Sequence, residues 1–342
     1  MSVDPESRRN GAGADAKRIL FLLQDRRLPS SRVRVLDLLP DLAQAGLRCV
    51  AEEYPRSWAG KIRMLARCVR SDVVFLQKKI PMPLETILLK LCSRRLVFDF
   101  DDAIYVRHES RGKSRSFTRE IKTRAVLRSA HLVIAGNAHL QAYAEACNRN
   151  VRILPSCVDV RGLPVQRHER LAGPVVVGWI GSHVNLSQLA LLEPVLQRLA
   201  RIRDLEVHVV CDRGLELSGV KVRHVPWTLE TQAARIAEFD IGVMPLPDSE
   251  HSRGKCGYKA IQCMAAGVPV VVSDVGFNRE LVADGVDGFR AATIPDFERR
   301  LLELIDSREL RRQMGARARE KIGRAYAVEQ AAGALAGMLE AL

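Results

Sequence analysis

The stretch GKCGYKAIQCMAAGVPVVVSDVG, residues 254–276, decides the fold because it predicts a loop, then a helix, then a buried strand. Gly254 and Gly257 let the backbone of the loop approach a ligand closely. Lys255 and Lys259 add positive charge at the same place. Together these residues indicate a phosphate-binding loop.

The helix of this stretch is predicted from about Tyr258 to Ala266, and its unpaired N-terminal amides would face the ligand. Gly267 fits the end of that helix, and the β-branched run after it fits a strand covered on both faces, as in a parallel sheet. An ordinary αβ unit with solvated lysines is equally compatible with the loop taken alone.

Strands and helices alternate on both sides of this stretch. Strands are predicted at 17–23, 71–77, 95–100, 131–136 and 151–156, then at 175–182, 205–212, 221–227, 239–246 and 268–274. The segment 30–50 is predicted to supply a loop, a helix and a second strand, and further helices are predicted near 83–93 and 115–129 and at 296–325 and 327–341. Strands separated by helices indicate a parallel, doubly wound sheet. The sequence therefore predicts an α/β protein with two Rossmann-like αβα domains facing a central cleft.

The domain boundaries follow from where the alternation stops and restarts. We predict a disordered tail at 1–16, an N-terminal Rossmann-like domain at 17–160, a linker at 161–174 rich in Pro, Gly and charge, and a second Rossmann-like domain at 175–325. The final helix, 326–342, is expected to pack on the outside or to cross back to the first domain. Ligands of such sheets bind at the carboxyl ends of the strands.

The positive charge lies in the N-terminal half. Of the formal net charge of +13, residues 1–160 hold +12 and residues 161–342 hold +1. A basic surface of this kind suits anionic lipid headgroups, an acidic acceptor or nucleic acid, or it serves solubility alone. Few aromatic residues accompany the charge and no nucleic-acid module is recognisable, so we predict no nucleic-acid partner.

The sequence also predicts the compartment. It holds no run of about 20 uncharged apolar residues, and its polar start lacks the apolar core of a secretory signal. The eight cysteines form no C-x-x-C pair, which favours free thiols over a zinc site. We therefore expect a cytoplasmic protein, with peripheral contact to the inner face of the membrane as a hypothesis.

Several segments resemble glycosyltransferases of the GT-B fold, specifically family 4. The resemblance spans about residues 17–325 and is carried by SSRVRVLDLLPDLAQAG, VFDFDDAIY, VIAGNAHLQAYA, ILPSCVD and VVVGWIGSHVN, and by GKCGYKAIQCMAAGVPVVVSDVGFNRELVADGVDGFRA. It implies a nucleoside diphosphate sugar as co-substrate in the second domain, a glycan or lipid-linked acceptor in the first, and transfer with retention. It implies no obligate metal and no further cofactor.

The same resemblance assigns residues to the donor. Catalytic charge would come from Arg253 and Lys255, which meet the departing diphosphate together with helix amides. The nucleotide-binding positions are Gly181, Ser182, Gly254, Gly257, Tyr258, Lys259 and Gln262.

The chain departs from the family at two of these positions. Many members carry two glutamates with seven residues between them, one near the donor sugar and one on the ribose, where this chain has Gly254 and Gln262. The amide of Gln262 can still bind a ribose hydroxyl. We expect Asp248 or Glu250 to replace the missing carboxylate. The usual Arg and Lys pair early in the second domain is also absent, which leaves the donor sugar open.

In the first domain, the loop after the first strand supplies the candidates Ser31, Arg32 and Arg34 for contact with the diphosphate or the acceptor. Capping of a helix by Ser30 or Ser31 is the competing interpretation.

Three carboxylates follow the strand that ends near Phe98. Asp99, Asp101 and Asp102 would lie at the carboxyl edge of the sheet, where their repulsion calls for hydrogen bonds or a cation such as Arg107. We predict an acceptor contact or proton acceptor here, with Asp102 as the preferred base, and helix capping or ion pairing as the alternative. His108 and Asn137 complete the predicted cleft, although a lone histidine is more often structural.

Three other functions compete with this hypothesis. The segment VFDFDDA imitates the Asp-x-Asp motif of magnesium-dependent phosphatases with an aspartyl nucleophile, or a GT-A metal site, but Ala103 stands where a Thr or Val is expected. Neither domain opens with G-x-G-x-x-G, which disfavours a nicotinamide dehydrogenase. A binding protein that keeps the fold and has lost the donor chemistry is the remaining alternative.

Overall fold

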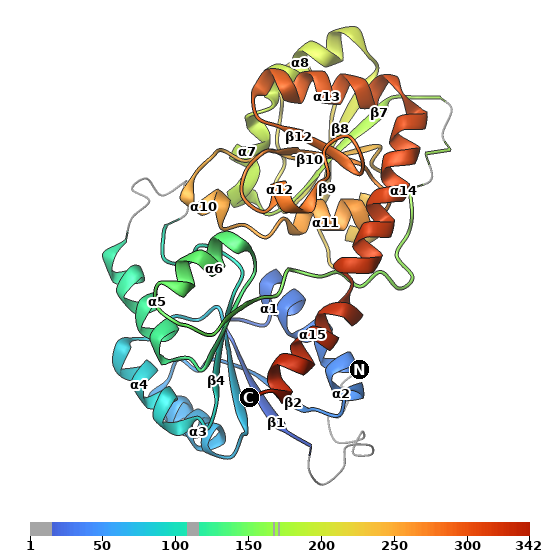
Figure 1. Cartoon of the computed structure of the whole chain (residues 1–342). Helices are drawn as coiled ribbons and strands as arrows, with labels where there is room; N and C mark the ends of the chain where they lie inside the picture. Colours follow the sequence, from blue (N-terminus) through green and yellow to red (C-terminus); the bar gives the residue numbers. More distant parts are fainter. Residues whose placement is uncertain (1–15, 108–115, 167, 170–171) are drawn as a thin grey trace.

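The computed structural model describes residues 16–107, 116–166, 168–169 and 172–342. It contains two six-stranded parallel sheets, each with helices on both faces, in two lobes stacked one above the other (Figure 1). This arrangement confirms the predicted α/β class and the two facing domains. His108 lies outside the described residues.

The first sheet has the order β2(Arg48–Glu53), β1(Arg18–Leu23), β3(Val73–Gln77), β4(Leu96–Phe100), β5(Leu132–Ala135), β6(Val151–Ile153). The second has the order β12(Gly288–Ala291), β11(Val270–Ser273), β10(Ile241–Met244), β7(Val175–Ile180), β8(Leu205–Cys211), β9(Val222–Pro226). Ten of these strands fall within the predicted ranges. Strands β2 and β12 were not delimited in advance, and β12 was missed altogether because GFRA is short and follows a turn.

The strand order reverses once in each sheet, between β1 and β3 in the first and between β7 and β10 in the second. Connections on the two sides of such a point leave the sheet in opposite directions, so a crevice opens beyond the carboxyl ends of the strands. The two sheets therefore present two crevices toward each other.

The helices of the first domain are α1(Pro29–Arg34), α2(Leu39–Gln44), α3(Trp58–Val69), α4(Pro83–Cys92), α5(Phe117–Ser129) and α6(Ala138–Glu145), with a 3₁₀ turn η1(Leu36–Leu38). Alternate residues of β1 point to opposite faces of the sheet. Leu20 and Leu22 pack with α3 to α6, whereas Ile19 and Phe21 pack with η1 and α2. Both faces are apolar, as the parallel arrangement requires.

The second domain carries η3(His183–Asn185), α7(Leu186–Ala190), α8(Glu193–Ile202), α9(Gln232–Ile236), α10(Glu250–Arg253), α11(Tyr258–Ala265) and α12(Asn278–Leu281), then α13(Ile294–Asp306) and α14(Arg308–Ala325). Residues of β7 alternate here too: Val176 and Ile180 face α11 and α14, and Val177 and Trp179 face α8 and α13. The predicted single helix at 296–325 is wrong. It is two helices, because Ser307 ends α13 and its side chain accepts a hydrogen bond from the Leu310 amide at the start of α14.

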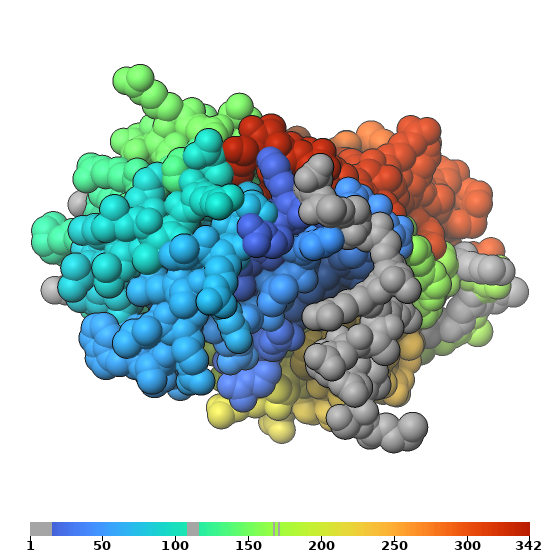
Figure 2. Space-filling view, turned by 90° about the horizontal axis from the view of Figure 1, so that it is seen from below, coloured from blue at the N-terminus to red at the C-terminus, as the bar shows by residue number. Residues whose placement is uncertain are grey.

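The last helix, α15(Val328–Glu340), leaves the second domain and packs on the first. Its apolar residues, among them Leu335 and Leu339, join the core that also contains Phe21 and Leu42. The Lys17 ammonium donates to the carbonyl of Leu339 at 3.3 Å. In Figure 2 the red C-terminal helix accordingly lies against the blue N-terminal segments. Across the described helices, none combines the length and the apolar character that a membrane crossing requires.

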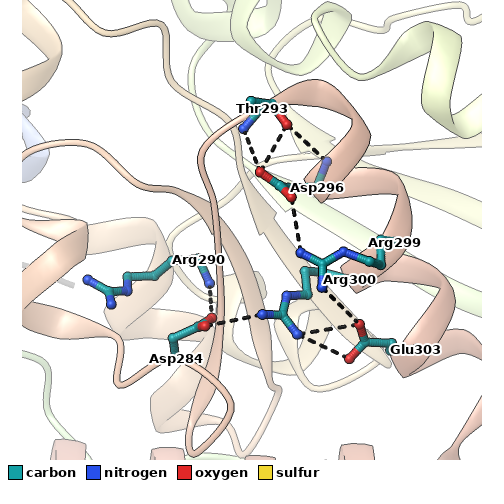
Figure 3. A network of polar contacts seen from close by, with 7 residues as sticks. All are labelled: Asp284, Arg290, Thr293, Asp296, Arg299, Arg300 and Glu303. Carbon is teal, nitrogen blue, oxygen red and sulfur yellow. Dashed lines mark hydrogen bonds and ion pairs between the residues drawn. The ribbon is translucent and has the colours of Figure 1, made fainter.

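A polar network fixes the start of α13 against β12 (Figure 3). The Thr293 hydroxyl accepts from the Asp296 amide at 3.2 Å and the Asp296 carboxylate accepts from the Thr293 amide at 3.1 Å, which is a reciprocal capping box. Asp284 accepts from the Arg290 amide at 2.8 Å and from the Arg300 guanidinium at 3.2 Å. The network is structural and lies away from the crevices.

Candidate active site

A cleft of about 670 Å³ lies between the two domains. Residues at both strand-order reversals line it. In the first sheet, Gln24 follows β1 and Lys78 follows β3. In the second sheet, Gly181 follows β7 and Met244 ends β10. The two crevices of the sheets thus join into one cavity, which is large enough for a small-molecule ligand.

The loop 254–257 and the start of α11 form one wall of the cleft. Gly257 precedes the helix with φ of 65°, a left-handed conformation that glycine adopts without strain. Lys255, Gly257, Tyr258 and Lys259 all line the cavity. The N-terminal amides of an eight-residue helix and two ammonium groups therefore meet there, which is the arrangement that binds phosphate.

Lys259 lies at the back of this wall. Its ammonium is 4.1 Å from the centre of the Trp179 ring. Burial, with a further contribution from the charge of Lys255, lowers the pKa of Lys259 to about 7. A side chain at Gly181 would come within 2.6 Å of that ammonium, so the predicted position Gly181 keeps space for the lysine.

The far end of the cleft is lined by amides. Gln262 donates to the Oε1 atom of Gln232 at 3.2 Å, and that oxygen also accepts from the Trp227 indole at 3.2 Å. All three residues line the cavity. Neither Gln232 nor Trp227 was predicted as a site residue, although Trp227 ends the predicted strand at 221–227 and Gln232 follows it.

The opposite wall belongs to the first domain, and at its centre two carboxylates share one lysine as their ion-pair partner. Lys78 forms an ion pair with Asp101 at 2.9 Å and another with Asp102. Burial alone would raise the pKa of Asp102, but Lys78, with smaller effects from Lys255 and His251, lowers it below its ordinary value. Lys78 has φ of 57°, an uncommon conformation for a residue other than glycine.

The predicted need for a cation is therefore met by Lys78, which sequence reasoning missed. The residue directly follows the buried strand β3, and a charged residue at a strand's carboxyl end was the available signal.

Asp99 and Arg34 do not line the cleft, in contrast to the prediction. They form a buried ion pair, with the Arg34 Nε donating to Asp99 at 3.2 Å, and both side chains are almost fully inaccessible. Asp99 shares its face of β4 with Val97, so it points into the core beneath α1. An aspartyl nucleophile at Asp99 is not supported, because Arg34 covers the carboxylate.

The residues that follow β1 divide between those that line the cleft and one that is buried beneath it. Helix α1 begins at Pro29 after Leu28, so neither serine caps it and that alternative is wrong. Ser30 and Arg32 line the cleft. Ser31 is buried and donates its hydroxyl to Gln77 at 3.0 Å, beneath the cleft wall.

The loop 254–257 is held by the first domain. The Asn137 amide donates to the carbonyl of Lys255 at 3.0 Å, and the Cys256 thiol donates to the carbonyl of Asp101 at 3.1 Å. A side chain at Gly254 would come within 2.7 Å of Ala103. Asn137 is therefore an interdomain contact, and close packing explains why no glutamate stands at Gly254.

The proposed carboxylate substitutes are engaged elsewhere. Asp248 pairs with Arg253 at 2.7 Å, and both side chains are about half exposed. Glu250 accepts from the Tyr105 hydroxyl at 2.8 Å and lies 3.0 Å from His139. Asp248, Glu250 and Arg253 are absent from the residues that line the cavity in the described part of the chain, whereas Ser182, Gln262 and Lys255 are present.

No group of three or more His, Cys, Asp or Glu side chains within the described residues is placed to hold a metal ion. The basic side chains that line the cavity are Arg27, Arg32, Lys78, Lys255 and Lys259.

Comparison with known proteins relates the second domain to a family and the whole chain to solved structures of the same fold. Residues 174–307 match the family described as glycosyl transferases group 1. Among solved structures, the chain is similar to HepE of Anabaena in complex with UDP and glucose, at 15% identity and a TM-score of 0.73, over 95% of this chain and 100% of that one.

Two further structures resemble it over a similar extent. Sucrose-phosphate synthase of Thermosynechococcus elongatus has 15% identity and a TM-score of 0.72, over 95% of this chain and 98% of the other. A glycosyltransferase of Rickettsia africae has 10% identity and a TM-score of 0.70, over 95% and 98%. No curated protein matches the chain significantly in sequence. Residues 174–307 are thus similar to the group 1 glycosyltransferase family, and the chain as a whole has the GT-B fold of these solved structures.

Proposed function

We propose that this protein transfers a sugar from a nucleoside diphosphate sugar to a glycan or lipid-linked acceptor. The observation that carries the proposal is the convergence of Lys255, Lys259 and the α11 amides on the cleft between the domains. Positive groups fixed in advance stabilise the charge that develops on a departing diphosphate. The family match of the second domain supports the same reaction.

The donor would lie along the second domain. Its diphosphate would meet Lys255 and Lys259, and its ribose would meet Gln262, whose amide supplies both a donor and an acceptor. Trp227 and Gln232 lie beside Gln262 and are suited to contact the base. The solved structures of HepE contain UDP or UDP-glucose, which makes UDP the first nucleotide to test.

The acceptor would lie against the first domain. Asp102 is held as a carboxylate by Lys78, and a carboxylate accepts a hydrogen bond from an acceptor hydroxyl. Its lowered pKa suits this contact better than proton abstraction, for which a pKa near the working pH is best. We propose that transfer proceeds with retention, as in family 4, and that charge stabilisation comes from side chains without a metal or other cofactor.

We further propose that the acceptor is a lipid-linked saccharide or a polysaccharide, reached from the cytoplasmic side of the membrane. The proposal is supported by the concentration of positive charge in residues 1–160, which suits anionic lipid.

A second function is favoured by one observation. The positions of the two usual glutamates hold Gly254 and Gln262, and contact with Ala103 leaves no room for a side chain at Gly254. A protein with this cleft could bind a nucleotide sugar without transferring it.

The test is thermal stabilisation by UDP, GDP, ADP, CDP and dTDP, each with and without EDTA, with NAD as the control. We expect stabilisation by one diphosphate that persists in EDTA, since binding to the native state raises the melting temperature. Release of free sugar from the matching donor then separates the two functions, because only a transferase cleaves the donor. A response that requires magnesium would contradict the proposed chemistry.

A further inference from the structure

Three helices of the first domain expose large apolar side chains in their first turns. Trp58 begins α3, Leu84 lies in the first turn of α4 and Phe117 begins α5, and these side chains are 70%, 64% and 79% exposed. About one turn later, each helix exposes a second large apolar side chain, and these are Ile62, Ile87 and Ile121. We call these six residues the rim.

The rim is distinct from the faces by which these helices join the core. Met64 and Cys68 of α3 and Leu89 of α4 are buried against the sheet. The helices are therefore already anchored, and the exposed apolar side chains form an additional face. Patches of this kind on soluble proteins mark interaction surfaces.

The topology places the rim beside the cleft. Helices α3, α4 and α5 follow the parallel strands β2, β3 and β4, and they lie side by side on one face of the sheet (Figure 1). Their first turns therefore stand at the carboxyl edge of the sheet, where the cleft also opens. Lys78 lines the cleft, and the exposed Met82 and Leu84 follow it directly in the chain.

Two of these three helices carry net positive charge, whereas α4 has one acidic residue, Glu85, and one basic residue, Lys90. Helix α3 has three basic residues, Lys61, Arg63 and Arg67, and no acidic one. Helix α5 has four basic residues and a single acid, Glu120. Aromatic and aliphatic side chains among lysines and arginines are the combination that binds the interface of an anionic membrane.

We propose that the rim docks on an anionic lipid bilayer, with its aromatic and aliphatic side chains inserted at the headgroup level. The lipid-linked acceptor in this inference rests on the proposed function. The docking on the bilayer does not depend on sugar transfer. A bilayer at the rim lies next to the wall that carries Asp101 and Asp102. A saccharide on a lipid carrier would then enter the cleft from the membrane side.

The experiment is flotation of the full chain with vesicles of phosphatidylcholine and phosphatidylglycerol in equal parts, and with phosphatidylcholine alone. We expect binding to the mixed vesicles that weakens with added salt. The triple variant Trp58→Ser, Leu84→Ser, Phe117→Ser should bind at least about tenfold more weakly, because each inserted side chain contributes a large apolar area.

The matched control is Ile202→Ser, a similarly exposed apolar residue at the end of α8 in the second domain, which should float like the wild type. Thermal stabilisation by nucleoside diphosphate, measured on the same samples, reports folding and the donor site separately. Nucleotide binding without flotation would overturn the docking and leave the proposed function intact. Flotation of the triple variant equal to that of the wild type would also overturn the docking. So would a wild-type dimer that the triple variant abolishes while neither protein floats, because the rim would then be an interface between two copies of the chain.

Discussion

Replacing Lys259 by Met removes its ammonium from the proposed donor site and keeps an apolar side chain against Trp179. The lysine has a pKa of about 7 in the folded protein and 10.5 as its ordinary value, because burial disfavours its charged form. The unfolded chain therefore binds the proton more tightly, and folding is penalised as the pH falls from 10.5 toward 7.

The size of the penalty follows from these two values. One pKa unit corresponds to about 1.4 kcal/mol, so the penalty is about 2 kcal/mol at pH 9 and rises to about 5 kcal/mol at pH 6. Lys259→Met lacks the penalty at every pH. The free energy of unfolding of the variant, minus that of the wild type, should accordingly be about 3 kcal/mol larger at pH 6 than at pH 9.

Urea unfolding at both pH values measures this difference, with Lys221→Met as the control, since the Lys221 side chain is 69% exposed. Nucleoside diphosphate affinity of the wild type should also fall as the pH rises through about 7, because the diphosphate favours the charged lysine. A difference in unfolding free energy that is the same at pH 6 and pH 9 would refute the reasoning.

The remaining predictions concern the loop 254–257. Lys255→Ala should lower kcat/KM about 10²–10³-fold at an unchanged melting temperature, and near-normal turnover would show that the loop is not the donor site. Gly254→Ala should cost about 1–3 kcal/mol in urea unfolding, because its Cβ would clash with Ala103, whereas Gly323→Ala, in open space on α14, should not destabilise. Asn137→Ala should cost a similar amount, about 1–3 kcal/mol, by leaving the carbonyl of Lys255 without its donor and the Leu140 amide at the start of α6 without its cap, and an unchanged stability would argue against these contacts.

The fold was predictable because its signals are local. Buried parallel strands appear as short β-branched runs, and ten of the twelve could be located from them. Strand β12 could not, since GFRA has neither the length nor the composition that separates a strand from a turn. The division between α13 and α14 was hidden because Ser307 is compatible with a helix interior as well as with a cap.

The candidate site was predictable only in part because its chemistry depends on contacts between distant segments. The loop around Lys255 is encoded in one stretch, and its place in the cleft follows from the αβ pattern. The pairing of Asp102 with Lys78, 24 residues earlier in the chain, depends on the adjacency of β3 and β4. The burial of Asp99 under Arg34 depends on which face of β4 is covered by α1, and the sequence of VFDFDD alone does not distinguish the three carboxylates.

Helix α15 has a consequence for biosynthesis. The inner face of β1, formed near the start of translation, stays open until Leu335 and Leu339 have left the ribosome, because these residues complete its core. The domain that is synthesised first therefore finishes folding last. In a nascent chain Leu38 and Leu42 would cover only part of the core around Ile19 and Phe21, and loss of the final 15 residues would destabilise the first domain rather than the second.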